Sequence, residues 1–301
     1  MTSLPDPRTD AEIPGFLTAL ELPGLADIHI HFLPARMQQK VWAVFDNAAE
    51  LYGYDWPITY RFDVATRLEI LRGFRIPAIP ALTYPHKPGM AAWLNDWNAA
   101  FAAEHADVIH CGTLYPEEGV GDYVRQALDA GARLFKMHVQ VGDFAPDSPL
   151  LAPAWEALAT AEVPVVIHVG SGPRPGRFTG PEHMRQVLAD FPQLHAVIAH
   201  MGMPEYHAFA DLAEDFEHVH LDTTMFATDF TNRMAPLDER YRSRLAELRE
   251  RVVLGSDFPT IPYPYAHQLE ALARLRLGEE WLRAVLWDNG ARLLGLPARS
   301  S

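Results

Sequence analysis

The chain has 301 residues, of which 49% are hydrophobic and 21% charged, the composition of an ordinary globular protein. Its formal net charge of −14 argues against a nucleic acid or an anionic membrane surface as a partner, because both carry the same sign of charge. Cys111 is the only cysteine, which excludes an intrachain disulfide and a thiolate-rich zinc site, so any metal must be held by histidines and carboxylates.

The N-terminal residues 1–24 are rich in proline, and we expect them to form an arm on the body of the protein. Their beginning lacks the apolar stretch of a signal peptide, and no run in the chain reaches the roughly 18 apolar residues of a membrane span. The cytoplasm is therefore the expected compartment.

Eight short apolar runs follow, and their β-branched residues predict buried parallel strands. They span residues 25–31, 76–82, 107–114, 132–138, 163–169, 195–200, 219–222 and 252–257. The second run is the weakest prediction, because Pro77 and Pro80 fit poorly in a central strand.

Helical patterns separate and follow these strands. They span residues 90–105, 121–130, 150–161, 181–191, 205–216, 236–251, 265–277 and 279–294. Strand followed by helix, eight times, predicts an α/β fold, a distorted (β/α)8 TIM barrel forming one domain over residues 25–296, with a tail at 297–301. A doubly wound open sheet is the alternative, but the chain lacks the glycine-rich phosphate fingerprint that would favour it.

The connection after the first strand, residues 32–75, is long enough to be an insertion. It carries six aromatic residues, namely Trp42, Phe45, Tyr52, Tyr54, Trp56 and Tyr60. They either form a satellite core under the insertion or contact a substrate. The connection at 223–235 is also long, and both are candidates for pocket walls.

Two histidines stand two residues apart at the end of the first predicted strand. His29 and His31 project from the same face of that strand, because side chains alternate along a strand. Such a pair is more often incidental than functional, so its meaning depends on what the rest of the chain supplies.

Further polar side chains mark the ends of four later strands. They are Lys136, His138, His168, His200 and Asp257. In a barrel these strand ends meet at one face, where active sites lie. Three imidazoles and one carboxylate suit zinc or another borderline divalent ion.

Five segments together carry a family resemblance. They are DIHIH at 27–31, VVIHVGSG at 165–172, VIAHMG at 197–202, LGSDFP at 254–259 and NGARLLGL at 289–296. In this order they resemble the amidohydrolase superfamily, and specifically the branch that includes aminocarboxymuconate-semialdehyde decarboxylase and related amidohydrolases.

The resemblance implies a metal site whose ligands are His29, His31, His168 and Asp257. One divalent ion is expected, Zn²⁺ before Mn²⁺. His200 is then the general acid/base or, with a carboxylated Lys136, part of a second metal site. A plain Lys136 that lines the pocket is the alternative to carboxylation.

The implied activity is that of a metal-dependent hydrolase. A metal-activated water, oriented by Asp257, would attack an amide, ester or lactone bond of a small acid-like substrate. The alternative on the same site is non-oxidative decarboxylation of an aromatic or dienoic acid. A metal-stabilised binding protein without turnover is a third reading, but it would not need a proton shuttle such as His200.

Six residues are predicted to contact the substrate, and they are Lys136, His138, Arg174, Arg177, Tyr84 and Tyr265. Arginine forks suit carboxylates, although surface solvation and packing are the plainer alternatives for each residue. The expected partner is a small molecule, and a homodimer is expected from the resemblance.

Overall fold

The computed structural model describes residues 6–299, so the ends of the predicted arm (1–5) and tail (300–301) lie outside the described residues. The chain divides into two compact units. Unit 1 joins Met1–Ile79 to Thr223–Ser301, and unit 2 is Pro80–Asp222. The short β1 (Ile79–Pro80) lies at the boundary of the units.

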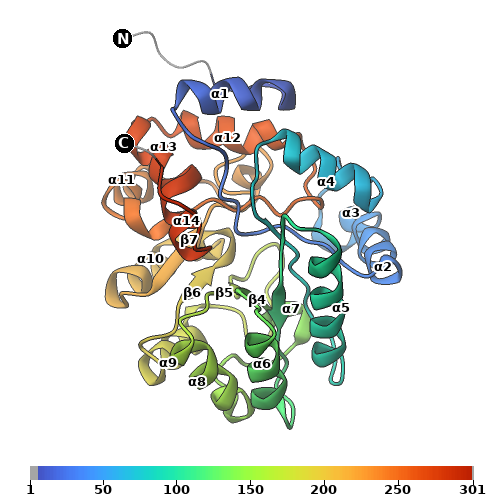
Figure 1. The fold of residues 1–301 in the computed structure, drawn as a ribbon. Helices are drawn as coiled ribbons and strands as arrows, with labels where there is room; N and C mark the ends of the chain where they lie inside the picture. The colour runs from blue at the N-terminus through green and yellow to red at the C-terminus, as the bar shows by residue number, and fades with distance from the viewer. Residues whose placement is uncertain (1–5, 300–301) are drawn as a thin grey trace. The chain divides into compact units, whose positions relative to one another are not determined.

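Unit 2, drawn in green and yellow in Figure 1, is built on consecutive parallel strands. They are β3 (Cys111–Thr113), β4 (Leu134–His138), β5 (Val165–His168), β6 (Ala196–Ile198) and β7 (Val219–Asp222). The register places His138 beside His168, at the carboxyl ends of β4 and β5. The predicted strands at 132–138, 163–169, 195–200 and 219–222 are confirmed, each ending within two residues of its predicted end.

Helices alternate with these strands, as the sequence predicts, and the first of them precedes β3. They are α5 (Ala91–Glu104), α6 (Val120–Asp129), α8 (Ala152–Thr160), α9 (Pro181–Asp190) and α10 (Tyr206–Asp215), with the short α7 (Val139–Gly142), η2 (Pro149–Leu151) and η3 (Ala199–Gly202). Within unit 2, α6 packs on α8 and α5 on β3 (Figure 1).

The predicted strand at 107–114 is divided into β2 (Val108–Ile109) and β3. Two buried asparagines of α5 accept backbone N–H groups of β3 through their side-chain oxygens. Oδ1 of Asn98 accepts the N–H of Cys111 at 2.7 Å, and Oδ1 of Asn95 accepts the N–H of Thr113 at 2.7 Å. Helix side chains thus satisfy donors that another strand would bond in a longer ladder.

Unit 1 is mainly helical in its described residues. Its elements before the boundary are η1 (Asp10–Glu12), α1 (Ile13–Ala19), α2 (Ala35–Phe45), α3 (Ala48–Tyr52) and α4 (Val64–Gly73). Those after it are η4 (Thr231–Arg233), α11 (Glu239–Glu247), η5 (Arg249–Arg251), β8 (Val252–Val253), α12 (Tyr265–Arg274), α13 (Glu279–Arg283), the π-helical η6 (Ala284–Asp288) and α14 (Asn289–Leu293).

Three predicted strands are shorter or less regular than expected. Residues 25–31 form no strand of their own. Ile30 makes an isolated bridge with Phe258, and the N–H groups of the segment bond carbonyls of several segments rather than one strand. The run at 252–257 keeps two strand residues in β8. The run at 76–82 keeps two in β1, one of them Pro80, which cannot donate to a ladder.

The insertion at 32–75 contains α2, α3 and α4, which the sequence did not predict. Its aromatic side chains support the satellite-core alternative. Trp56 is 8% exposed, donates its indole N–H to the carbonyl of Thr260 at 2.8 Å, and lies 4.7 Å from the ring of Phe230 and 5.1 Å from that of Phe45.

The expected arm is folded where it is described. In α1 and just beyond it, Ile13, Phe16, Leu17 and Leu20 are buried, so this segment contributes to the core of unit 1. Across residues 6–299, no helix combines the length and the apolar character needed to cross a membrane.

A pair of imidazoles makes the stability of the fold depend on pH. His195 and His218 precede β6 and β7, and their rings stack at 4.5 Å. Burial, followed by the neighbouring His218, lowers the pKa of His195 below its ordinary value. The unfolded chain therefore binds more protons, and stability falls as the pH drops below about 6.5.

We expect the melting temperature of the wild type to fall between about pH 7 and about pH 5, and the variant His195→Gln to lose part of that fall. Calorimetry of both proteins across this range measures the effect. His110, whose pKa burial also lowers, stays in both proteins, so part of the slope remains. An identical slope in the two proteins would contradict the assignment to His195.

Candidate metal centre

The predicted pair, His29 and His31, lies close to the predicted carboxylate, Asp257, in unit 1, and we call these three residues the triad. Nε2 of His29 lies 3.1 Å from Nε2 of His31, and Oδ1 of Asp257 lies 3.2 Å from His31 and 3.7 Å from His29. His29 is 1% exposed and His31 6% exposed. Three of the four predicted ligands therefore point their donor atoms at one place.

These separations fit a single divalent ion. Ligand bonds of about 2.1 Å separate two donor atoms by about 3.0 Å at right angles and about 3.4 Å at the tetrahedral angle. The two shorter separations, 3.1 and 3.2 Å, lie within that range, and the third is 3.7 Å. Two imidazoles and one carboxylate are also a donor set that zinc and similar ions accept.

Contacts outside this triad hold His29 in position. Its Nδ1 lies 2.9 Å from the hydroxyl of Thr224, and its backbone N–H donates to Oδ1 of Asp27 at 3.0 Å. If Nδ1 carries the proton given to Thr224, the lone pair of Nε2 is free to face the triad. Asp27, which is completely buried, also accepts the hydroxyl of Tyr265 at 2.7 Å.

Backbone pairing brings Asp257 to the two histidines. Its N–H donates to the carbonyl of His29 at 2.9 Å, and the N–H of His31 donates to the carbonyl of Phe258 at 2.8 Å. Asp257 itself has φ 69°, in the left-handed region that aspartate adopts more readily than most residues. The loop after β8 thus turns sharply to present the carboxylate.

Two glycines allow close backbone approaches beside the histidine motif, and one of them, Gly290, belongs to the segment NGARLLGL. A Cβ at Gly290 would lie 2.4 Å from the carbonyl oxygen of Ala26, so only glycine lets α14 approach the segment before His29 so closely. A Cβ at Gly24 would similarly lie 2.1 Å from the carbonyl oxygen of Arg75. The C-terminal helix is therefore part of what supports the ligand segment.

The remaining predicted histidines gather in unit 2. The ring of His168 stacks on that of His138 at 4.0 Å and lies 4.6 Å from that of His200. Nε2 of His168 lies 3.1 Å from the carbonyl oxygen of Gly172. A proton on Nε2 would satisfy that carbonyl. His168 stays a predicted metal ligand.

His200 lies just after β6, in η3, with φ 55°. Its backbone N–H donates to Oδ1 of the completely buried Asp222, at 2.9 Å. The carboxylate fixes the turn from which the imidazole of His200 projects.

The other predicted contacts of unit 2 differ in burial. Lys136 is completely buried in β4, and its carbonyl accepts the hydroxyl of Thr113 at 2.7 Å. The ring of Tyr84 lies 5.1 Å from that of His138. Arg174 and Arg177 are exposed, the latter with its guanidinium 4.9 Å from the ring of Phe178.

Tyr265 is the predicted substrate contact whose role we reassign. It is completely buried at the start of α12, and its hydroxyl is engaged with Asp27. Burial, followed by Asp27, raises its pKa well above the ordinary value, so the hydroxyl stays protonated as a donor. We assign it to support of the ligand segment rather than to substrate binding.

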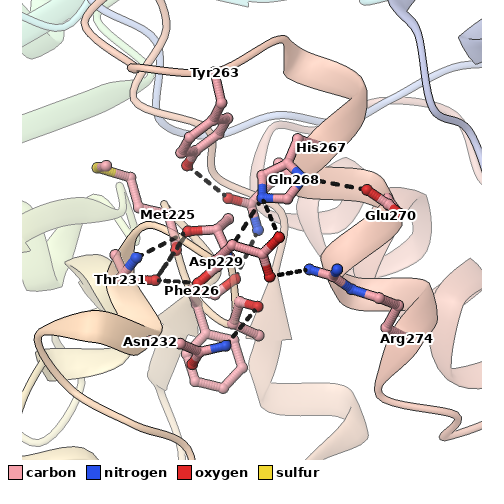
Figure 2. A network of polar contacts seen from close by, with 12 residues as sticks. Met225, Phe226, Asp229, Thr231, Asn232, Tyr263, His267, Gln268, Glu270 and Arg274 are labelled. Carbon is pink, nitrogen blue, oxygen red and sulfur yellow. Dashed lines mark hydrogen bonds and ion pairs between the residues drawn. The ribbon is translucent and has the colours of Figure 1, made fainter. Parts of the chain in front are cut away.

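The connection after β7, predicted as a pocket wall, is fixed to α12 in unit 1 (Figure 2). Gln268 donates to the carbonyl of Phe226 at 3.1 Å, and His267 accepts the N–H of Asp229 at 3.3 Å. Arg274 holds the carboxylate of Asp229 at 2.9 Å. The loop that carries Thr224 is thus anchored.

Comparisons with known proteins identify the family. The family model described as amidohydrolase matches residues 26–296. The chain belongs to the amidohydrolase family. No curated protein matches this amidohydrolase significantly in sequence.

Solved structures share the fold of this amidohydrolase at low sequence identity. An uncharacterised TIM-barrel protein from Bordetella bronchiseptica has a TM-score of 0.70 and 18% identity, over 89% of this chain and 98% of its own. The 5-carboxyvanillate decarboxylase of Sphingomonas paucimobilis has a TM-score of 0.57 and 14% identity, over 91% and 100%. A probable 2-pyrone-4,6-dicarboxylic acid hydrolase from Acinetobacter baumannii has a TM-score of 0.59 and 13% identity, over 90% and 98%.

These similarities confirm the TIM-barrel fold class and the predicted family. The amidohydrolase therefore combines the fold of metal-dependent enzymes with a His–His–Asp cluster able to hold an ion.

Proposed function

We propose that the protein is a metal-dependent hydrolase of an amide, ester or lactone bond in a small substrate that carries an acidic group. The observation that carries the proposal is the convergence of His29, His31 and Asp257, with donor atoms 3.1 to 3.7 Å apart. The family match over residues 26–296 supports it.

The proposal gives each residue a chemical task. A divalent ion, Zn²⁺ in our proposal, would supply a nucleophile by lowering the pKa of a water molecule toward neutrality. His29, His31, His168 and Asp257 bind the ion. Asp257 would also orient the attacking water, and His200 would transfer the proton to the leaving group.

The acidic group of the substrate is assigned to basic side chains of unit 2. Lys136 in β4 is our first candidate, because an ammonium group forms charge-assisted hydrogen bonds with a carboxylate. Arg174 and Arg177 lie in the exposed loop after β5, where their forks are accessible to an anion. His138 and Tyr84, whose rings lie 5.1 Å apart, are proposed to line the same pocket.

Decarboxylation of an aromatic or dienoic acid is the second candidate. Its support is the fold shared with two 5-carboxyvanillate decarboxylases, one of which binds manganese together with a nitrobenzoic acid. Both reactions use an acidic substrate and a divalent ion, so they differ in their products rather than in the ligand set.

Removal and return of the metal tests the proposal. We expect the chelated protein to lose turnover of lactone and amide acids, and Zn²⁺ or Mn²⁺ to restore it at one ion per chain. Mass spectrometry of the products separates hydrolysis, which adds water, from decarboxylation, which releases carbon dioxide. Two ions per chain would instead favour the site that includes a carboxylated Lys136, and activity that survives chelation would contradict the metal-dependent reaction.

A further inference from the structure

The carboxylate of Asp10, which precedes the family match at residues 26–296, contacts the first turn of α12. Oδ1 of Asp10 accepts the N–H of Ala266 at 2.9 Å, and Oδ2 accepts the hydroxyl of Tyr60 at 2.5 Å. The oxygen of Tyr60 in turn accepts the N–H of Tyr265 at 2.6 Å. Helix α12 follows Pro264 and has no side-chain cap of its own. Residues distant in sequence thus satisfy the first two free N–H groups of this helix.

The same helix turn continues the chain of hydrogen bonds toward the metal centre. The side chain of Tyr265 donates to Oδ2 of Asp27 at 2.7 Å, and Oδ1 of Asp27 accepts the N–H of His29 at 3.0 Å. Tyr265 and Asp27 are completely buried, and Tyr60 is 4% exposed. These three side chains therefore depend on protein partners rather than on water for their hydrogen bonds.

We propose that Asp10 is a positioning residue for the metal ligand His29, acting through Tyr60, Tyr265 and Asp27. The proposal rests on the metal centre of the proposed function and adds a part that the family match, which begins at residue 26, does not include.

The physical reason is the small tolerance of a metal centre. Thr224 contacts the ring of His29, and Asp27 accepts its backbone N–H. Asp27 is held by the Tyr265 hydroxyl, whose position depends on the start of α12 and hence on Asp10. Removing contacts that orient ligands costs about 10- to 100-fold in metal affinity, and more remote coupling costs less.

The variants are chosen to break single bonds in the path. Asp10→Asn keeps an oxygen for the N–H of Ala266 but replaces the acceptor of the Tyr60 hydroxyl with an amide donor. Tyr265→Phe removes the hydroxyl that reaches Asp27. The matched control is Asp6→Asn, the same substitution in the same segment, at a carboxylate that pairs with the exposed Arg276 at 3.5 Å.

Co²⁺ titration of the metal-free, full-length protein, followed by visible absorption, measures the effect. We expect affinity for Co²⁺ to fall about 3- to 10-fold in Asp10→Asn and about 10- to 100-fold in Tyr265→Phe, with altered ligand-field bands, and to stay unchanged in Asp6→Asn. Tyr60→Phe, which keeps the ring packed on Phe258, provides a second break in the path if Asp10→Asn does not fold.

The melting temperature of each metal-free variant distinguishes positioning from general support. Variants that lose thermal stability yet bind Co²⁺ with the affinity and spectrum of the wild type would overturn the inference. Failure of the proposed function looks different, because the wild type and His31→Ala would then bind Co²⁺ equally. If the wild type binds Co²⁺ tightly and Asp10→Asn binds it equally well, the inference about Asp10 is refuted and the proposed function is not.

Discussion

Replacing His31 with alanine is expected to abolish stoichiometric metal binding and, with it, turnover. His31 is the member of the triad closest to both others, at 3.1 Å from His29 and 3.2 Å from Asp257. Its removal leaves two of the three donors of the triad, and we expect affinity to fall more than about 100-fold, beyond the cost of losing an outer contact. Equilibrium dialysis with Zn²⁺ and elemental analysis measure the loss.

The matched control for this experiment is His183→Ala. His183 also pairs with a carboxylate, Asp147 at 2.9 Å, but lies in α9, outside the triad. It should keep the metal content and turnover of the wild type. Asp257→Asn offers a second test that preserves side-chain shape, and it should weaken both metal binding and turnover. Full metal content in His31→Ala would show that the triad is not the site.

Replacing His200 with asparagine is expected to separate chemistry from metal binding. Asparagine is preferred to alanine for this test, because His200 has φ 55° and asparagine tolerates the left-handed region. Loss of a general acid/base lowers turnover by about 10²- to 10⁴-fold. We therefore expect metal content near that of the wild type and a fall in kcat of this size, measured on the substrate identified by product analysis.

His195→Ala is the control for that experiment, since His195 precedes β6 and His200 follows it. The two variants remove an imidazole from opposite ends of one strand. Retained turnover in His200→Asn would reject its catalytic role. Loss of the metal ion in the same variant would instead favour the alternative in which His200 ligates a second ion.

The parts of the fold that follow from sequence are those with continuous local signals. The sequence predicts four strands correctly, β4, β5, β6 and β7, because each is a buried apolar run. The helices between them have clear hydrophobic periodicity. The segment at 25–31 is also a short apolar run, yet its backbone N–H groups bond carbonyls in distant parts of the chain, such as that of Leu286. Nothing in its own residues distinguishes a strand from an extended segment with scattered partners.

In the candidate site, too, the roles that follow from residue type could be predicted, and the roles that depend on partners distant in the sequence could not. His29, His31 and Asp257 could be predicted because the residue types themselves bind metals. The tyrosine at 265 could not be assigned correctly, because its partner Asp27 lies 238 positions away in the sequence. Asp10 gave no signal either, since an acidic residue in a proline-rich segment is typical of an exposed arm.

The ligands of unit 1 come from both ends of the sequence, with His29 and Asp257 separated by 228 positions. A chain is synthesised from its N-terminus, so a growing chain that already contains both histidines still lacks the carboxylate until residue 257 has been added. α14, whose Gly290 packs against Ala26, is made later still. We therefore expect the complete triad to bind a metal ion only after residue 257 has been synthesised and has paired with the segment that carries His29.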